Sequence, residues 1–157
     1  MKNNITKGMT DTTFVPGNDC TRGQVVTFLW RAAGSPKPTS TEHSFTDVEE
    51  GKYYYDAMLW AVEKGITKGM TDTTFEPDTK CNRGQVVTFL WRAKNQPEPE
   101  STEHPFTDVT NPKAFYYEAM LWAVENEITT GINATTFAPD KICNRGEVVT
   151  FLHRAYK

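Results

Sequence analysis

Apolar residues recur along the chain in two kinds of segment, and both have the spacing of a helix. In the segment "VVTFLWRA", residues Val86, Val87, Phe89, Leu90 and Trp91 leave almost no polar face. A helix with so little polar surface belongs in the interior of a domain. Because closely similar segments occur three times, we expect three such helices to pack together in a central bundle.

The other segment, "AMLWAVE", is predicted to form a helix over about Tyr54–Lys64 and again over about Tyr116–Asn126. Gly65 follows the first copy and is expected to take the left-handed conformation that ends many helices. In the second copy Glu127 stands at that place. There we expect Asn126 to take the left-handed role one residue earlier.

Both segments belong to a repeat, which is the most informative feature of the chain. Arg22, Arg83 and Arg145 occupy the same place in successive copies and lie 61 and 62 residues apart. The stretches "FTDV", "YYDAMLWAVE" and "ITKGMTDTTF" recur in register with them. One full unit therefore consists of FTDV, a helix, a loop, a second helix and a linker, and the chain begins inside such a unit.

The repeat predicts one mainly α domain over residues 1–157. We expect its modules to form a pseudo-threefold assembly, a pseudo-trimer, with outer helices and long loops around the central bundle. Half of the first unit is missing, so either a preceding part was cut away or another element replaces the missing helix. The predicted parts are a partial module 1 over 1–34, a linker over 35–44, module 2 over 45–94, a linker over 95–105 and module 3 over 106–157.

Composition narrows the classes of function. A chain of 157 residues with 38% hydrophobic and 24% charged residues is typical of a globular protein. A net charge of −3 gives no basis for a nucleic-acid surface. The longest apolar stretches are far shorter than the roughly 20 residues of a membrane span, and the opening residues lack the apolar core of a signal peptide. We therefore expect neither nucleic-acid binding nor membrane insertion.

The residue types that carry catalysis or bind metals do not form a recognisable set. Cys20, Cys81 and Cys143 occur once per repeat without C-x-x-C spacing, so we expect small buried side chains, although a disulfide between two of them is not excluded. Asp72 lacks the spacing of a calcium loop and is expected to close a turn. Histidines and carboxylates suggest no converging acid and base. We expect no catalytic residue, no metal, no cofactor and no enzyme activity.

An arginine at the start of each apolar helix is harder to explain. Asn82 and Gln85 have the spacing of a capping box, which places Arg83 at the first helical position. Thr21 with Gln24 and Asn144 with Glu147 repeat this spacing. A cation there is mildly opposed by the helix dipole. One explanation is a bound anion, attracted by the amides, the dipole and the guanidinium together. The other is an ion pair with a carboxylate such as Asp47 or Asp108 of a neighbouring unit, and the residues alone leave both open.

The residues near the other end of these helices have a simpler explanation. Arg31, Arg92 and Arg154 lie where positive charge suits the helix dipole, so a structural role is favoured. Trp30 and Trp91 could stack on sugar rings, but a place in the core is the favoured interpretation.

The unit resembles the S-layer homology domain. The resemblance rests on "FTDV", "YYDAMLWAVEKGITKG", "TFEP" and "CNRGQVVTFLWRA", and it covers nearly the whole chain outside the linkers and the first few residues. It implies a three-pronged, mainly helical monomer at the bacterial cell surface, typically of a Gram-positive envelope. Such domains attach surface proteins to secondary cell-wall polysaccharide, often by holding a pyruvylated sugar in grooves between modules.

The resemblance also implies which residues contact the sugar. In the family the last motif is usually Ile-Thr-Arg-Ala-Glu, and its arginine contacts the acidic ketal. The implied ligand-binding residues are Arg22, Arg83 and Arg145, the neighbouring Thr21, Asn82 and Asn144, and, from the preceding loop, Gly8, Gly69, Gly131, Lys7 and Lys68.

Departures from the family pattern change what is expected of the pocket. Cys replaces the usual Ile and Gly the usual Ala after the arginine, so the floor of the pocket is expected to differ. Thr130 stands where the other copies have lysine, and Glu127 adds negative charge. We therefore expect the groove that uses the third loop to bind more weakly or not at all. Truncation of the first module is also expected to remove part of one groove wall.

The leading hypothesis is noncatalytic attachment to an anionic cell-wall polysaccharide. The alternative is a protein-binding or assembly module that uses the same scaffold without glycan binding.

Overall fold

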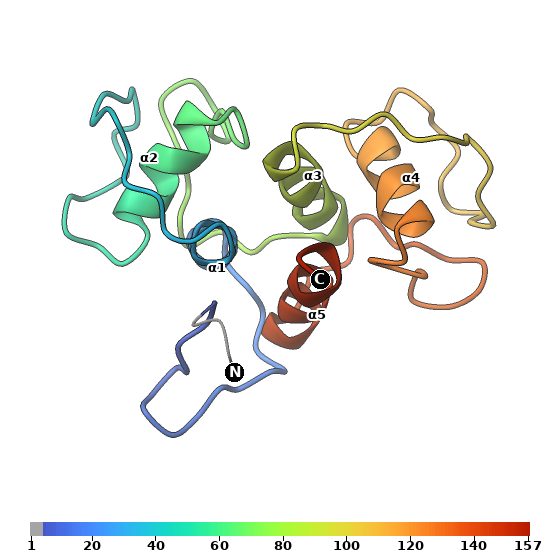
Figure 1. Cartoon of the computed structure of the whole chain (residues 1–157), viewed down its shortest axis with the longest axis horizontal. Helices are drawn as coiled ribbons and strands as arrows, with labels where there is room; N and C mark the ends of the chain where they lie inside the picture. Colours follow the sequence, from blue (N-terminus) through green and yellow to red (C-terminus); the bar gives the residue numbers. More distant parts are fainter. Residues whose placement is uncertain (1–4) are drawn as a thin grey trace.

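The computed structural model describes residues 5–157 as five helices joined by long loops (Figure 1). The first four residues of the partial module 1 lie outside the described residues. The helices are α1 Arg22–Ala32, α2 Tyr55–Glu63, α3 Arg83–Ala93, α4 Tyr117–Glu125 and α5 Arg145–Ala155. Within residues 5–157 there is no strand and only isolated β-bridges, so the predicted mainly α class is confirmed.

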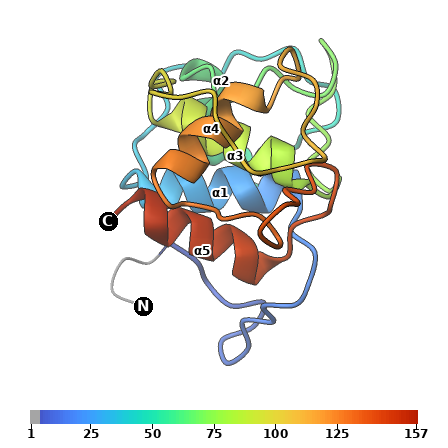
Figure 2. The same ribbon diagram turned by 90° about the vertical axis from the view of Figure 1, so that its right-hand side faces the viewer.

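The helices form an inner and an outer set. The inner helices α1, α3 and α5 contact one another, whereas α2 packs against α1 and α4 packs against α3 (Figures 1 and 2). Each outer helix thus packs on the inner helix that precedes it, across a linker. The unit that packs together is therefore inner helix, linker, outer helix and loop, which differs from the order of the unit in the sequence.

A closed ring of backbone hydrogen bonds joins the three segments that lead into the inner helices. The amide of Cys20 donates to the carbonyl of Cys143, Cys81 donates to Cys20, and Cys143 donates to Cys81, each at 2.9 Å. All three cysteines are completely buried and free, which confirms the predicted small buried side chain and excludes a disulfide. The three cysteine side chains thus pack where three distant chain segments meet.

Each inner helix begins with the predicted capping box. The N-cap side chain accepts the third helical amide, and the Gln or Glu at that position accepts the amide of the N-cap residue. The pairs are Thr21 with Gln24, Asn82 with Gln85, and Asn144 with Glu147.

The two outer helices end in the same way, which corrects one prediction. Gly65 has the expected positive φ of 67°. Asn126 does not take this role: its φ is −92°, and Glu127 is left-handed instead with φ of 55°. The reason is the buried Ile128, whose amide donates to Ala123 and fixes the start of the following loop. Glu127 must then adopt a conformation that costs a non-glycine residue roughly 1 kcal/mol.

The turn in the loop after α2 is stabilised by the residue before Asp72, and not by Asp72 itself. The hydroxyl of Thr71, and not the carboxylate of Asp72, accepts the amides of Thr73 and Thr74 at 3.3 and 3.0 Å. The predicted role of Asp72 is therefore wrong.

The linkers are fastened by the tryptophans of the preceding helices. The indole N–H of Trp30 donates to the carbonyl of Pro36 at 2.8 Å, and that of Trp91 donates to Pro97 at 2.9 Å. Both rings pack on the core, so the structural interpretation of these tryptophans is confirmed.

The buried cysteines give a first test of the structure. Burial raises the pKa of each thiol to about 12, so at pH 8 only about one thiol in ten thousand is ionised. We expect a thiol reagent at pH 8 to react with no cysteine in the folded protein and with all three in guanidinium. Stoichiometric reaction before unfolding would contradict the cysteine ring.

Candidate functional site

The three repeated arginines are almost completely buried. Arg22 and Arg83 are 2% exposed and Arg145 is 3% exposed. The guanidinium of Arg22 lies 5.1 Å from the ring centroid of Phe75 and 5.5 Å from that of Phe89. The same arrangement surrounds the other two arginines, with Phe137 and Phe151 around Arg83, and Phe14 and Phe28 around Arg145. One ring in each pair comes from a loop and the other from an inner helix.

The loops in these contacts are named loop 1 (residues 5–19), loop 2 (66–80) and loop 3 (128–142). Nε of Arg22 donates to the carbonyl of Phe75 in loop 2 at 2.8 Å, and Nη2 lies 3.4 Å from the hydroxyl of Thr67. Arg83 makes the same pair of bonds to loop 3, at 2.7 Å to Phe137 and 3.0 Å to Thr129. These acceptors are neutral, so the arginines are held by loop carbonyls and hydroxyls.

Arg145 repeats this pattern in loop 1. Its Nε donates to the carbonyl of Phe14 at 3.0 Å and its Nη2 to the carbonyl of Lys7 at 3.2 Å. With the module boundaries predicted from the repeat, each of the three arginines connects the start of an inner helix to a loop of another module.

The carboxylates proposed as ion-pair partners act on the loops. Asp47 accepts the amides of Phe75 and Glu76 at 2.8 and 2.7 Å. Asp108 accepts the equivalent amides of loop 3, at 2.9 and 2.7 Å. The predicted ion pairs of Arg22 and Arg83 with these residues are wrong. The aspartates instead fix the peptide whose carbonyl receives the arginine.

The helix amides expected to bind an anion are already used. The amide of Arg22 donates to Thr79 and that of Gly23 to Pro77, both at 2.8 Å. The third amide donates to the N-cap side chain. The same bonds recur at α3 and α5, so the hypothesis that backbone amides help to bind an anion is wrong.

Gly84, directly after Arg83, lies against an aromatic ring of the protein. A Cβ on Gly84 would lie 3.0 Å from the ring of Tyr116, which covers this point from the start of α4. The missing side chain thus admits an aromatic ring of the protein and not a ligand.

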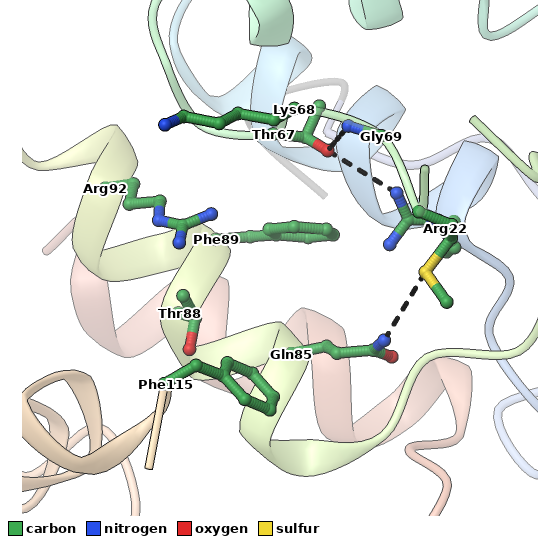
Figure 3. A pocket seen from close by; sticks show the side chains of 10 residues that line it. Arg22, Thr67, Lys68, Gly69, Gln85, Thr88, Phe89, Arg92 and Phe115 are labelled. Carbon is green, nitrogen blue, oxygen red and sulfur yellow. Dashed lines mark hydrogen bonds between the residues drawn. The ribbon is translucent and has the colours of Figure 1, made fainter. Parts of the chain in front are cut away.

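One nitrogen of two arginines remains available. Nη1 of Arg22 has no hydrogen-bond partner among the described residues, and no buried side-chain polar atom there is unsatisfied, so Nη1 reaches solvent. Arg22 lines a cavity of about 230 Å³, the Arg22 groove (Figure 3). Its lining is Arg22, Thr67, Lys68, Gly69, Met70, Gln85, Thr88, Phe89, Arg92 and Phe115.

The Arg145 groove is the equivalent cavity of about 320 Å³. Nη1 of Arg145 is likewise without a partner among residues 5–157. The lining is Lys7, Gly8, Met9, Gln24, Thr27, Phe28, Arg31, Tyr53 and Arg145, which are the repeat counterparts of the Arg22 groove.

Both grooves are positively charged although the whole chain has a net charge of −3. Three cations and no carboxylate line the Arg22 groove, where the ring of Phe89 lies between Arg22 and Arg92 (Figure 3). Burial lowers the pKa of both guanidinium groups from their ordinary value. A partly buried cation without a countercharge favours an anionic ligand.

The arginines near the C-terminal ends of α1 and α3 have a second position-dependent feature besides their favourable interaction with the helix dipole. Arg31 and Arg92 line the grooves. Nη1 of Arg92 also donates to the carbonyl of Ile66 at 3.1 Å, and Arg154 makes the same bond to Ile128.

The surroundings of Arg83 differ from those of Arg22 and Arg145, because the helix beside Arg83 is α5, which carries a glutamate. Oε1 of Glu147 lies 3.6 Å from Nη1 of Arg83, the nitrogen that is available in the other two copies. Glu147 also accepts Nζ of Lys141 at 2.9 Å. Burial tends to raise the pKa of Glu147, but the amide of Asn144 and Lys141 outweigh it, so the pKa is lowered and the carboxylate is ionised. An internal anion thus lies beside the nitrogen that has no partner in Arg22 and Arg145.

Several predicted site residues serve the fold. The side chains of Thr21, Asn82 and Asn144 cap helices and do not line the two grooves. Gly69 has φ of 93°, and a Cβ there would lie 2.5 Å from the ring of Phe45. Gly131 has the same constraint in loop 3.

The predicted lysines and the glycines of loops 1 and 2 do lie at the grooves. Lys7 and Gly8 line the Arg145 groove, and Lys68 and Gly69 line the Arg22 groove.

Other groove residues were missed by the sequence reasoning. Gln85, Thr88 and Phe115 line the Arg22 groove, and their counterparts Gln24, Thr27 and Tyr53 line the Arg145 groove. Tyr53 and Phe115 are 53% and 58% exposed. The sequence does contain a signal for Tyr53 and Phe115, because both copies have a second aromatic residue at this position, shortly before the outer helix.

Two further observations concern the part of the chain that the structure describes. None of its helices has the length and apolar character to cross a membrane. None of its His, Cys, Asp and Glu side chains gather in a group of three that could hold a metal ion.

The chain matches a known family model over more than half of its length. The model described as "S-layer homology domain" matches residues 2–26, 44–87 and 105–149. The first match covers loop 1 and the start of α1, whereas the other two each begin before "FTDV" and end within an inner helix.

Similar proteins include cell-surface proteins and a glucanase. The chain is 32% identical to the Surface-layer 125 kDa protein of Lysinibacillus sphaericus over 67% of the chain and 9% of that protein. Cell surface glycoprotein 1 of Acetivibrio thermocellus is 26% identical over 95% of the chain and 7% of that protein. An endoglucanase of a Bacillus species is 26% identical over 90% and 15%. The chain spans less than a fifth of the length of these relatives.

The aspartate of FTDV gives a test of how the site is held. We expect Asp47→Ala to lower the free energy of unfolding by about 2 kcal/mol, because two loop amides lose a charged acceptor. The melting temperature should fall by about 4–8 °C. Asp72→Ala, in the same loop, is the control and should change stability by less than about 0.5 kcal/mol. Equal effects of the two changes would contradict the assignment.

Proposed function

The chain belongs to the S-layer homology domain family, and on this basis we propose that it holds its protein at the cell wall by binding an anionic wall polysaccharide in the Arg22 and Arg145 grooves. Family membership supplies the general function, since the chain is an attachment module of the bacterial cell surface. The ligand, the grooves and the role of the arginines are the proposal. The proposed role is noncatalytic.

The available Nη1 of Arg22 and Arg145 is the observation that supports this function most directly. It lies in a groove with two further cations and no carboxylate. A carboxylate on a sugar, such as a pyruvyl ketal, would accept from Nη1 and face the lysine of the loop. Each charge-assisted hydrogen bond of this kind contributes about 1.5–3 kcal/mol.

The rest of each groove suits a sugar ring. Phe115 and Tyr53 offer exposed aromatic faces at the edge of the two grooves, and Gln85 and Gln24 offer amide groups. Aromatic faces with polar groups beside them bind the mixed apolar and hydroxylated surface of a sugar.

Neither groove can form within a single module. With the boundaries proposed from the repeat, the Arg22 groove takes Arg22 from module 1, Lys68 and Arg92 from module 2, and Phe115 from module 3. The Arg145 groove combines the three modules in the same way. The domain is therefore proposed to act as one monomeric unit with two sites. Two weak sites on one polymer reinforce each other through effective concentration.

The lysines give a test that avoids the buried arginines. We expect the double variant Lys7→Gln/Lys68→Gln to bind purified wall polysaccharide at least about tenfold more weakly, because one exposed cation is lost from each groove. Isothermal titration calorimetry measures this affinity.

The matched control is Lys37→Gln/Lys113→Gln, which removes the same charge from exposed positions outside both grooves. Equal weakening in both variants would reject groove binding. Retention of the domain on walls stripped of polysaccharide, and its loss after protease treatment of the walls, would favour a protein partner instead.

A change at Glu147 tests the proposal in the opposite direction, because it should increase binding. We expect Glu147→Gln to strengthen binding to the polysaccharide, because it releases Nη1 of Arg83 and still completes the capping box, as Gln85 does in α3. Lost contacts with Lys141 should cost no more than about 1 kcal/mol of stability. Glu98→Gln, in a linker, controls for net charge. No gain in binding, or the same gain in the control, would contradict the role of Glu147.

A further inference from the structure

Both grooves follow one face of an inner helix for about two turns. The residues of α3 that line the Arg22 groove lie at positions i, i+3, i+4 and i+7 of the helix, namely Gln85, Thr88, Phe89 and Arg92. The four residues of α1 that line the Arg145 groove have the same spacing. Seven residues of an α-helix span about 10 Å. Each groove is therefore longer than a single sugar ring.

A cation stands at each end of this stretch. At one end the guanidinium of Arg22 lies 5.5 Å from the ring centroid of Phe89. At the other end Arg92 lies almost one turn further along α3, and Figure 3 shows the ring of Phe89 between the two guanidinium groups. The Arg145 groove has Arg31 at the equivalent position. The two arginines of each groove thus face different parts of a bound molecule.

The guanidinium of Arg92 is fixed by one nitrogen and offers the other two. Its Nη1 donates to the carbonyl of Ile66 at 3.1 Å. Its Nε and Nη2 have no partner within residues 5–157, and these two nitrogens form one edge of the guanidinium plane. Such an edge matches the two oxygens of a carboxylate or a phosphate, so Arg92 is set to bind one anionic group with two parallel hydrogen bonds.

No carboxylate balances the charge of these second arginines. Neither Arg31 nor Arg92 forms an ion pair in the part of the chain that the structure describes, and no Asp or Glu lines either groove. Both residues are half-buried, and burial lowers the pKa of both guanidinium groups from the ordinary value. A cation that is partly removed from water without a countercharge favours an anionic partner.

The equivalent arginine of α5 separates the bond to a loop from a place in a groove. Arg154 makes the same bond as Arg92, from Nη1 to the carbonyl of Ile128 at 3.1 Å. Arg154 is nevertheless an exposed residue and lies outside both grooves. It is therefore a matched control for the structural part of the role of Arg92.

We propose that the ligand of these grooves carries two anionic groups on neighbouring sugars, and that Arg31 and Arg92 bind the second group. The inference rests on the proposed function, in which Nη1 of Arg22 or Arg145 binds the first acidic group. The second group is a carboxylate or a phosphate, since both present two oxygens to the free edge of the guanidinium. The substrate class is thus an acidic polysaccharide with charges on successive sugars, and the second arginines select for it.

Three disaccharides test this selection by isothermal titration calorimetry with the full chain. Each carries a pyruvyl ketal on one sugar, and its other sugar is glucose, glucuronic acid or glucose 6-phosphate, joined in either order. We expect glucuronic acid or glucose 6-phosphate to give at least about tenfold tighter binding than glucose, because a bidentate charged contact is gained. The tighter of the two acidic disaccharides identifies the second group as a carboxylate or a phosphate.

Variants of the second arginines test where the preference arises. We expect Arg31→Gln/Arg92→Gln to reduce the preference to about twofold or less, while the affinity for the glucose disaccharide stays within about threefold. Arg31→Lys/Arg92→Lys keeps the charge but loses the two-nitrogen edge, so its preference should lie between those of the Gln variant and the unchanged chain. Arg154→Gln removes the same charge and the same loop bond as Arg92→Gln, and should keep the full preference.

The outcomes separate this inference from the proposed function. Equal binding of the three disaccharides by the unchanged chain would overturn the inference alone. A preference that survives in the Gln variant, or that Arg154→Gln also abolishes, would overturn it as well. Failure of all three disaccharides to bind the unchanged chain would overturn the proposed function together with the inference.

Discussion

The structure depends on a buried guanidinium that lies between two phenylalanine rings and donates to a loop carbonyl. This contact occurs at Arg22, Arg83 and Arg145, and each time it joins the start of an inner helix to a loop from another module. Removing an arginine from water is costly unless its donors are satisfied. The loop carbonyls and hydroxyls supply acceptors, and the ring faces supply cation–π attraction. The aspartates of FTDV support these contacts by fixing the carbonyl that accepts Nε.

The same contact explains how a structural group could also serve a ligand. A guanidinium has five N–H donors, and the loop takes those of Nε and one of Nη2, so Nη1 is free to face outward. At Arg22 and Arg145 it opens into a groove with two more cations. At Arg83 a glutamate on the neighbouring helix occupies it. Nη1 is thus free in two of the three arginines and paired with a carboxylate in the third. The difference comes from one exchange, since Glu147 replaces the Gln of the other two inner helices.

The sequence predicted features that depend on neighbours along the chain. The helices, the capping boxes, the left-handed Gly65 and the buried cysteines all follow from local chemistry or from apolar spacing. Features that depend on distant segments were not predictable in this way. The carbonyl of Phe75 as partner of Arg22, and the use of the helix amides by loop 2, arise from a contact between modules. The left-handed Glu127 was missed because the packing of Ile128 overrides the local preference of Asn126. Glu147 was read as part of a capping box, and its second contact appears only when α5 is placed beside α3.

The most direct test is to observe the three guanidinium groups by nitrogen-15 NMR while an acidic wall oligosaccharide is added. The account predicts that the side-chain signals of Arg22 and Arg145 shift as the ligand saturates, while those of Arg83 stay in place. Binding that shifts none of the three, or that shifts Arg83 as much as the other two, would contradict it.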